Sequence, residues 1–213
     1  MKKVRVLLAD DHKIVLEGLR SLLEPEFEIV GTVEDGRALL KAAEKLSPDV
    51  VVADISMPFL NGIEAVRQIR QENDKIKVVF LTMHPDVTYA TRAFEAGASG
   101  YVLKHSAPDE LVTAVREATK GRTYVTPIIA GELMQSYKEG VHLRDDAITK
   151  LTTRQREVLQ LLAEGHSAKE VGDILCISPR TVEFHKYKIM EELNLKTSAE
   201  LLQYAIKHGI VSI

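Results

Sequence analysis

A chain of 213 residues, 45% of them hydrophobic, is long enough for two small domains, and no apolar run approaches the roughly 20 residues of a membrane helix. The net charge of −3 argues against binding nucleic acid through bulk positive charge. The single cysteine, Cys176, excludes an internal disulfide and favours a reducing, cytoplasmic location, with the thiol expected to be a buried structural one.

The first 120 residues alternate short apolar runs with amphipathic helical segments. Five buried strands are predicted, at Val4–Ala9, Phe27–Val33, Val50–Asp54, Val78–Thr82 and Gly100–Leu103. Five strand-then-helix units of this length predict a parallel sheet with helices on both faces. In such a sheet the ligand site lies beyond the carboxyl ends of the strands. We therefore predict an α/β domain over residues 1–120.

The second half of the chain has a different pattern. Residues 121–149 are broken by glycines and a proline and are predicted to be a linker, with at most a short helix over Ile128–Tyr137. Over residues 150–213 the strands cease, and four short helices are predicted. Capping patterns mark their starts, at Thr152 with Gln155, Ser167 with Glu170, Ser178 before Pro179, and Thr197 with Glu200.

Polar side chains end four of the predicted strands: Asp10 and Asp11, Asp54, Thr82, and Lys104. Because parallel strands end at one edge of their sheet, we expect these side chains to converge. Three carboxylates would repel one another there unless a divalent cation joined them, and hard oxygen ligands suit Mg²⁺. A lysine and a hydroxyl beside them would complete a site for phosphoryl transfer, with one carboxylate attacking in line.

Each of these residues has a more ordinary explanation when taken singly. A strand-end aspartate or threonine is more often a helix cap or turn residue, and a lysine there is usually a solvated surface residue. Only the combination of five suitable residue types at these strand ends points to phosphoryl chemistry.

Five motifs resemble the receiver domain of two-component response regulators, over about residues 3–120: A-D-D-H at 9–12, D-I-S-M-P at 54–58, N-G-I-E at 61–64, L-T-M-H at 81–84 and G-Y-V-L-K at 100–104. The resemblance implies a flavodoxin-like fold in which Asp54 accepts a phosphoryl group from a histidine kinase. It also implies a Mg²⁺ site formed by Asp10, Asp11, Asp54 and the backbone carbonyl of Ser56.

The same resemblance implies a phosphate-sensing group. Thr82 and Lys104 match the two residues that sense the phosphoryl group, and Tyr101 matches the aromatic residue that changes rotamer when the threonine moves. A half-buried strand tyrosine is the alternative for Tyr101. His105 stands where relatives often carry an acid, which affects the adjoining surface rather than the chemistry.

The segment Ser167–Leu195 predicts two capped helices joined by I-S-P-R, a layout that places the second helix in a DNA major groove. A plain helical hairpin is the alternative. On the second helix, Val182, Ile189 and Leu193 share one stripe and are expected in the core. The opposite face is unusual because aromatic residues lie beside basic ones, and a protein-binding face is its alternative use. The candidate DNA contacts are Lys169, Arg180, Thr181, Glu183, Phe184, Lys186, Tyr187 and Lys188.

The stretches L-T-T-R-Q-R-E-V-L-Q-L-L-A-E-G at 151–165 and S-P-R-T-V-E-F-H-K at 178–186 resemble the LuxR-type helix-turn-helix. With the receiver, the whole chain resembles the NarL/FixJ class of regulators. That class implies promoter DNA and RNA polymerase as partners and a homodimer contact on the last helix, about residues 198–208. Leu201 and Leu202 would serve that contact, although both fit a core equally well.

The leading hypothesis is a transcription regulator controlled by phosphorylation, and not an enzyme. An aspartyl-phosphate phosphatase is the second, but such enzymes resemble one another in a D-x-D motif, whereas Asp10 and Asp11 are adjacent. A regulator controlled by a small apolar ligand is the third, disfavoured by 5% aromatic residues and no tryptophan. A regulator controlled by protein contact without phosphorylation stays open.

Residues 151–213 carry 8 basic and 8 acidic side chains, so dimerisation is expected to raise the DNA affinity.

Overall fold

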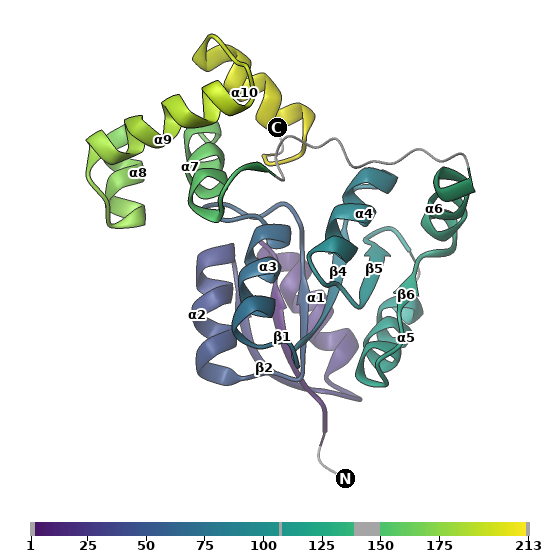
Figure 1. The fold of residues 1–213 in the computed structure, drawn as a ribbon. Coiled ribbons are helices and arrows are strands. Elements are labelled where there is room, and N and C mark those ends of the chain that lie inside the picture. Colours follow the sequence, from purple (N-terminus) through teal and green to yellow (C-terminus); the bar gives the residue numbers. More distant parts are fainter. Residues whose placement is uncertain (1–2, 107, 139–149, 212–213) are drawn as a thin grey trace. The chain divides into compact units, whose positions relative to one another are not determined.

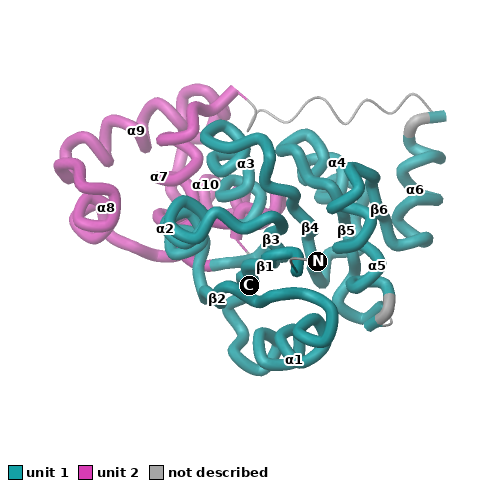
Figure 2. The backbone as a smooth tube through the Cα atoms, turned by 90° about the horizontal axis from the view of Figure 1, so that it is seen from below, with its two compact units in different colours: residues 1–57, 62–143 teal, residues 58–61, 144–213 magenta. Residues whose placement is uncertain are grey.

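The structure is a computed structural model that describes residues 3–106, 108–138 and 150–211. The chain forms two compact units, residues 1–57 with 62–143 and residues 58–61 with 144–213 (Figure 2). Within the described ranges, no helix combines the length and the apolar character needed to cross a bilayer.

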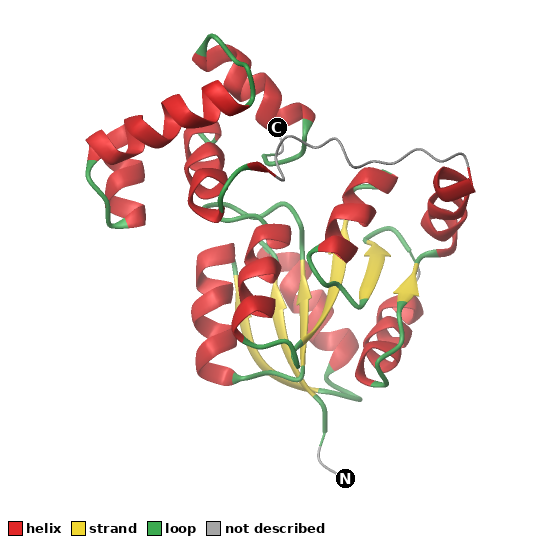
Figure 3. Ribbon diagram, viewed as in Figure 1, coloured by secondary structure: helices red, strands yellow, loops and turns green. Residues whose placement is uncertain are grey.

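Strands and helices alternate along the first unit (Figures 1 and 3). Its strands are β1 (Arg5–Ala9), β2 (Glu28–Val33), β3 (Val50–Ala53), β4 (Lys77–Thr82), β5 (Gly100–Leu103) and β6 (Tyr124–Val125). Its helices are α1 (Lys13–Leu23), α2 (Gly36–Leu46), α3 (Gly62–Glu72), α4 (Val87–Glu95), α5 (Pro108–Thr119) and α6 (Pro127–Lys138).

The strands form one parallel sheet in the order β2-β1-β3-β4-β5-β6. Helices α1 and α5 cover one face, and α2, α3 and α4 cover the other (Figures 1 and 2). All four residues of β3 are buried, as expected of a continuous apolar strand that is covered on both faces. The predicted parallel α/β fold is confirmed, and every strand ends at the same edge.

The prediction of five strands is one strand short, because β6 pairs in parallel with β5 through Gly100–Tyr124 and Tyr101–Val125. A strand of two residues is too short to leave a periodic pattern, so it was missed within residues 121–149. Thr126, directly after β6, forms two hydrogen bonds with β5. Its N–H donates to the carbonyl of Tyr101 (3.0 Å), and its hydroxyl accepts from Leu103 N–H (3.2 Å).

The second unit is helical. Within residues 150–211 it contains the four predicted helices, which are α7 (Thr153–Ala163), α8 (Ala168–Leu175), α9 (Pro179–Glu192) and α10 (Ser198–Lys207). Apolar side chains from all four helices form its core. The buried members are Leu151, Val158, Leu159, Leu161, Val171, Leu175, Val182, Ile189, Leu193, Leu201, Ala205 and Ile210.

The predicted caps begin these helices. Thr152 with Gln155 and Ser167 with Glu170 form complete capping boxes, and Ser178 caps α9 just before Pro179. Thr197 also caps α10, but the Glu200 carboxylate accepts from the N–H of Lys196 (2.7 Å) instead of closing a box. Each cap satisfies backbone N–H groups that have no partner within the first turn.

The prediction that Cys176 is buried is wrong, because this side chain is exposed. Cys176 ends α8 in the left-handed conformation, with φ of 54°. This backbone conformation turns the chain sharply toward α9 and leaves the thiol outside the core. The core positions around it are filled by Val171 and Leu175 instead.

Candidate functional site

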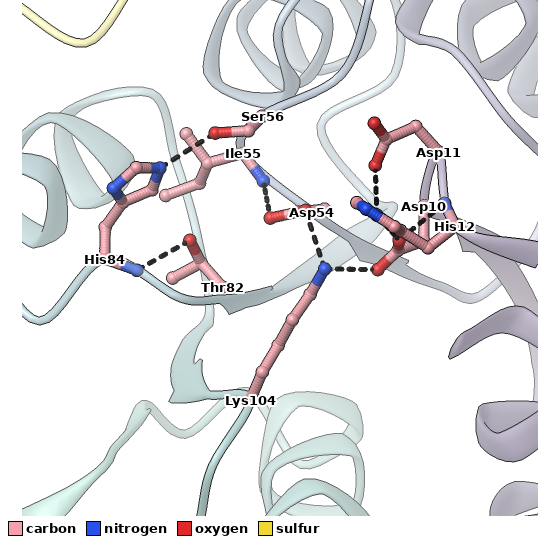
Figure 4. Close-up of polar contacts among 9 residues, drawn as sticks. All are labelled: Asp10, Asp11, His12, Asp54, Ile55, Ser56, Thr82, His84 and Lys104. Carbon is pink, nitrogen blue, oxygen red and sulfur yellow. Dashed lines mark hydrogen bonds and ion pairs between the residues drawn. The ribbon is translucent and has the colours of Figure 1, made fainter. Parts of the chain in front are cut away.

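The carboxyl edge of the sheet carries a cluster of charged and polar side chains (Figure 4). Asp10 follows β1, Asp54 follows β3, Thr82 is the last residue of β4, and Lys104 follows β5. The expected convergence is present: Asp10, Asp54 and Thr82 are all buried at this edge, with exposed fractions of 5% or less. The order β1-β3-β4-β5 makes these four strands consecutive neighbours, which brings the residues together.

Lys104 joins the two buried aspartates. Its Nζ lies 2.7 Å from Asp10 Oδ2 and 2.7 Å from Asp54 Oδ2, and only 12% of its side chain is exposed. Burial lowers the pKa of Lys104, but its hydrogen bonds with Asp10 and Asp54 together act more strongly, so the pKa lies above its ordinary value. The lysine therefore stays charged inside the pocket.

Asp54 also accepts a hydrogen bond from the backbone N–H of Ile55 (2.7 Å). Burial raises the pKa of the Asp54 carboxyl, although the hydrogen bond and the charge of Lys104 act in the opposite direction. The contact with Lys104 therefore does not fully compensate the burial of Asp54. The pocket thus carries negative charge that Lys104 does not compensate and that a further cation can neutralise.

Asp11 lies at the mouth of the same pocket, with 34% of its side chain exposed. His12 Nδ1 lies 2.7 Å from Asp11 Oδ1, and the N–H of His12 donates to Asp10 Oδ1 (3.0 Å). Asp10, Asp11 and His12 form the cluster within the described residues whose ligand atoms are close enough to hold a metal ion. Carboxylates predominate here, which is the donor chemistry that a hard divalent cation prefers.

Thr82 and Tyr101 both bind the backbone of His84, at the start of the loop that leads to α4. The hydroxyl of Thr82 accepts from the N–H of His84 (3.2 Å), and the hydroxyl of Tyr101 donates to the carbonyl of His84 (2.8 Å). Tyr101 is fully buried, not half-buried, and its burial raises the pKa of its hydroxyl above the ordinary value. The backbone of His84 therefore links Thr82, the predicted phosphate sensor, to Tyr101, the predicted switch residue.

Two features of this site were not predicted. A Cβ placed on Gly62 would lie 2.0 Å from the carbonyl oxygen of Asp54, so only glycine allows α3 to begin this close to the end of β3. Ser56 Oγ lies 2.8 Å from His84 Nε2, and the His84 ring stacks on Tyr89 of α4. Gly62 and His84 were recognised only as members of the N-G-I-E and L-T-M-H motifs, without a role of their own.

The second unit presents the predicted DNA face on α9. Val182, Ile189 and Leu193 are buried as predicted, whereas Phe184 and Tyr187 expose 58% and 70% of their surface. The other predicted contact residues are at least partly accessible. Those that are exposed are Lys169, Arg180 and Lys188, and those of intermediate exposure are Thr181, Glu183 and Lys186. Lys188 forms an ion pair with Glu191 on the same helix (2.7 Å).

A parallel α/β unit with an acidic pocket at its strand ends, followed by a helix-turn-helix unit, defines a receiver-type regulator. The family model "Response regulator receiver domain" matches residues 6–116, and the model "Bacterial regulatory proteins, luxR family" matches residues 149–205. The chain belongs to the response regulators of two-component systems, in the NarL/FixJ class. It is a phosphorylation-controlled DNA-binding transcription regulator.

Similar proteins match over nearly their whole length. The transcriptional regulatory protein DegU of Brevibacillus brevis is 34% identical, over 99% of this chain and 96% of its own. The response regulator GacA of Pseudomonas aeruginosa is 36% identical, over 98% of each chain. A structure of two RcsB dimers bound to two parallel DNAs is similar with a TM-score of 0.59 and 29% identity, over 95% of this chain and 98% of that one.

Proposed function

We propose that Asp54 is the phosphoacceptor and that a histidine kinase is the donor. The observation that supports this most is the buried Lys104, which lies 2.7 Å from carboxylates of both Asp10 and Asp54. An Asp54 carboxylate oxygen attacks the phosphorus in line, the P–N bond to the donor imidazole breaks, and the imidazole nitrogen keeps the electron pair. Lys104 and Thr82 then bind oxygens of the new acyl phosphate.

The residues of the pocket fit a Mg²⁺ ion. Asp10, Asp11 and Asp54 would hold it together with the backbone carbonyl of Ser56. These are hard oxygen donors, and their charge exceeds what Lys104 compensates. When bound, Mg²⁺ neutralises charge on the transferring phosphoryl oxygens. The chain's own residues orient the attack: Ile55 N–H fixes Asp54 Oδ1 at 2.7 Å, and Lys104 fixes Oδ2 at the same distance.

We expect Asp11→Asn to weaken Mg²⁺ binding by at least about tenfold, the loss that even an outer-shell partner can cause. The substitution removes one carboxylate charge from the pocket and leaves the buried Asp10–Lys104–Asp54 contacts in place. Phosphorylation by a small phosphodonor is measured against Mg²⁺ concentration. Glu72→Gln, which removes an exposed carboxylate at the opposite edge of the sheet, is the control. An equal Mg²⁺ requirement in both variants would remove Asp11 from the ligand set.

Phosphate on Asp54 draws Thr82 and Lys104 toward the new oxygens and repositions the backbone around α4. Tyr101 follows because its hydroxyl is bonded to the carbonyl of His84, whose N–H is bonded to Thr82. The population of receivers shifts between two arrangements, which is how a local charge acts at a distance. No steady turnover of a small phosphate ester is expected, since the acceptor is part of a switch.

The α9 face is proposed to bind the major groove of promoter DNA, in the cytoplasm, where RNA polymerase is the further partner. Phe184 suits a thymine methyl group, and Arg180 suits a phosphate or a guanine edge. Because residues 151–213 carry 8 basic and 8 acidic side chains, one copy lacks the charge for tight binding. A homodimer doubles the contacts. RcsB binds DNA as dimers, which supports this arrangement.

We expect Phe184→Ala and Tyr187→Ala each to weaken specific DNA binding by roughly five- to tenfold and to reduce discrimination between operator and random DNA. Both side chains are exposed, so the free energy of unfolding should change by less than about 0.5 kcal/mol. Binding is measured at one fixed salt concentration. Met134→Ala, which removes a side chain exposed to 67% in the first unit, is the control. Unchanged discrimination would instead favour a protein-binding role for this face.

A further inference from the structure

The side chain of His84 makes two contacts that the proposed switch through Thr82 and Tyr101 does not use. Its Nε2 lies 2.8 Å from the hydroxyl oxygen of Ser56, two residues after Asp54 (Figure 4). Its ring stacks on the ring of Tyr89, with a centroid distance of 4.1 Å and an interplanar angle of 5°. One imidazole therefore touches both the loop that carries the acceptor and helix α4.

These contacts are well defined by their surroundings. The backbone of His84 is held on both sides, by Thr82 Oγ1 through its N–H (3.2 Å) and by the hydroxyl of Tyr101 through its carbonyl (2.8 Å). His84 is half-buried, and this burial lowers its pKa more than the charges of Asp54 and Asp86 raise it. With the backbone fixed and the ring stacked, the imidazole has little freedom to leave Ser56.

We propose that the His84 side chain is a positioning residue that couples the phosphoacceptor loop to α4 through the series Ser56–His84–Tyr89. This inference rests on the proposed phosphorylation of Asp54. When the acceptor loop adjusts to the phosphoryl group, Ser56 moves with it, and the hydrogen bond passes that movement to the imidazole. The stacked ring passes it to Tyr89 and thus to α4, in parallel with the backbone route through Thr82 and Tyr101.

A series connection makes a prediction that a merely structural role does not. Breaking either link interrupts the whole route, so removing both links reduces the coupling between the acceptor loop and α4 no more than removing one. His84→Phe keeps a ring for Tyr89 but cannot bond to Ser56, whereas Tyr89→Leu keeps the hydrogen bond and removes the stack. Ser56→Ala breaks the first link from its other side, and Ser56→Thr restores a hydroxyl.

The measured quantity is the gain in operator affinity that phosphorylation of the full chain produces, compared between variants at equal labelled fraction. A small phosphodonor with Mg²⁺ supplies the phosphoryl group. We expect His84→Phe, Ser56→Ala and Tyr89→Leu each to reduce this gain by roughly three- to tenfold, the effect of losing one hydrogen bond or ring contact. The double variant Ser56→Ala/Tyr89→Leu should lose no more than either single variant, although no hydrogen bond or ring contact joins the two residues in the described structure.

Two further measurements separate coupling from damage to the fold. Ser56→Thr should recover most of the gain, and His105→Phe, the same change at an exposed histidine, should match the wild type. Because the chain has no tryptophan, Tyr89→Trp introduces a single tryptophan beside the imidazole, whose fluorescence can be excited selectively. Its emission should change on phosphorylation when His84 is present. With His84→Phe in the same chain, this change in emission should be at least about threefold smaller.

The outcomes separate this inference from the proposal on which it rests. If the wild type is labelled and His84→Phe and Ser56→Ala both keep its full gain in affinity, the inference is overturned and Asp54 is not affected. Additive losses in the double variant also overturn it, because they would mean two independent local effects. If the wild type takes no label at all, both the acceptor and the coupling route are overturned.

Discussion

Asp54→Asn is expected to lower labelling by a small phosphodonor in the presence of Mg²⁺ by more than about a thousandfold, the scale on which other sites lose their nucleophile. Asparagine has nearly the shape of aspartate but lacks the carboxylate that attacks phosphorus. The pair between Lys104 and Asp10, at 2.7 Å, remains to hold the pocket together. On the denatured protein, label that hydroxylamine releases, which is acyl phosphate, is measured separately from label that resists it.

Asp74→Asn is the matched control, because Asp74 is an exposed residue between α3 and β4, at the opposite edge of the sheet. It should be labelled like the wild type. Operator binding of Asp54→Asn should no longer respond to the phosphodonor, while its basal binding is retained. Labelling of Asp54→Asn at the wild-type level would mean that another side chain is the acceptor.

Gly62→Ala is expected to destabilise the first unit by about 3 kcal/mol, the upper part of the usual range for overpacking. The added methyl group would lie 2.0 Å from the carbonyl oxygen of Asp54 and 3.1 Å from Cα of Ile55. Both neighbours are backbone atoms and cannot rotate away, so either α3 or the acceptor loop must shift. Since a displacement of about 1 Å can cost about a hundredfold in rate, the labelling rate should fall as well.

Gly18→Ala is the control for this substitution. Gly18 lies inside α1 with no atom within 4 Å of an added Cβ, so alanine there should stabilise by about 0.5–1 kcal/mol through helix propensity alone. Urea unfolding of the two variants and the initial labelling rate provide the measurements. A Gly62→Ala protein as stable and as rapidly labelled as the wild type would show that α3 does not need its close approach to Asp54.

The site residues that were predictable share one property: their position along a strand determines where they lie. Asp10, Asp54, Thr82 and Lys104 could be assigned to one pocket because parallel strands end at one edge and their order is restricted by short connections. The buried stripe of α9 was predictable for a similar reason, since helical periodicity alone places Val182, Ile189 and Leu193 together.

The features that were missed depend on contacts made after the elements pack against one another, whatever the separation of the residues in the chain. The approach of Gly62 to Asp54, the contact of Ser56 with His84 and the stack of His84 on Tyr89 leave no periodic pattern. The two-residue strand β6 and the exposed thiol of Cys176 were missed because a neighbouring strand and a left-handed cap decide them.

The sequence by itself therefore determined the class of protein, through the motifs that resemble receiver and LuxR-type domains, and it predicted the chemistry of the pocket around Asp54 from residue type and strand position. Only the tertiary structure decided how Asp54 is connected to the rest of the receiver. It showed Lys104 shared between two buried aspartates, and His84 hydrogen-bonded to three neighbours and stacked on a fourth. Such connections arise from packing, in which segments distant in sequence come within contact distance.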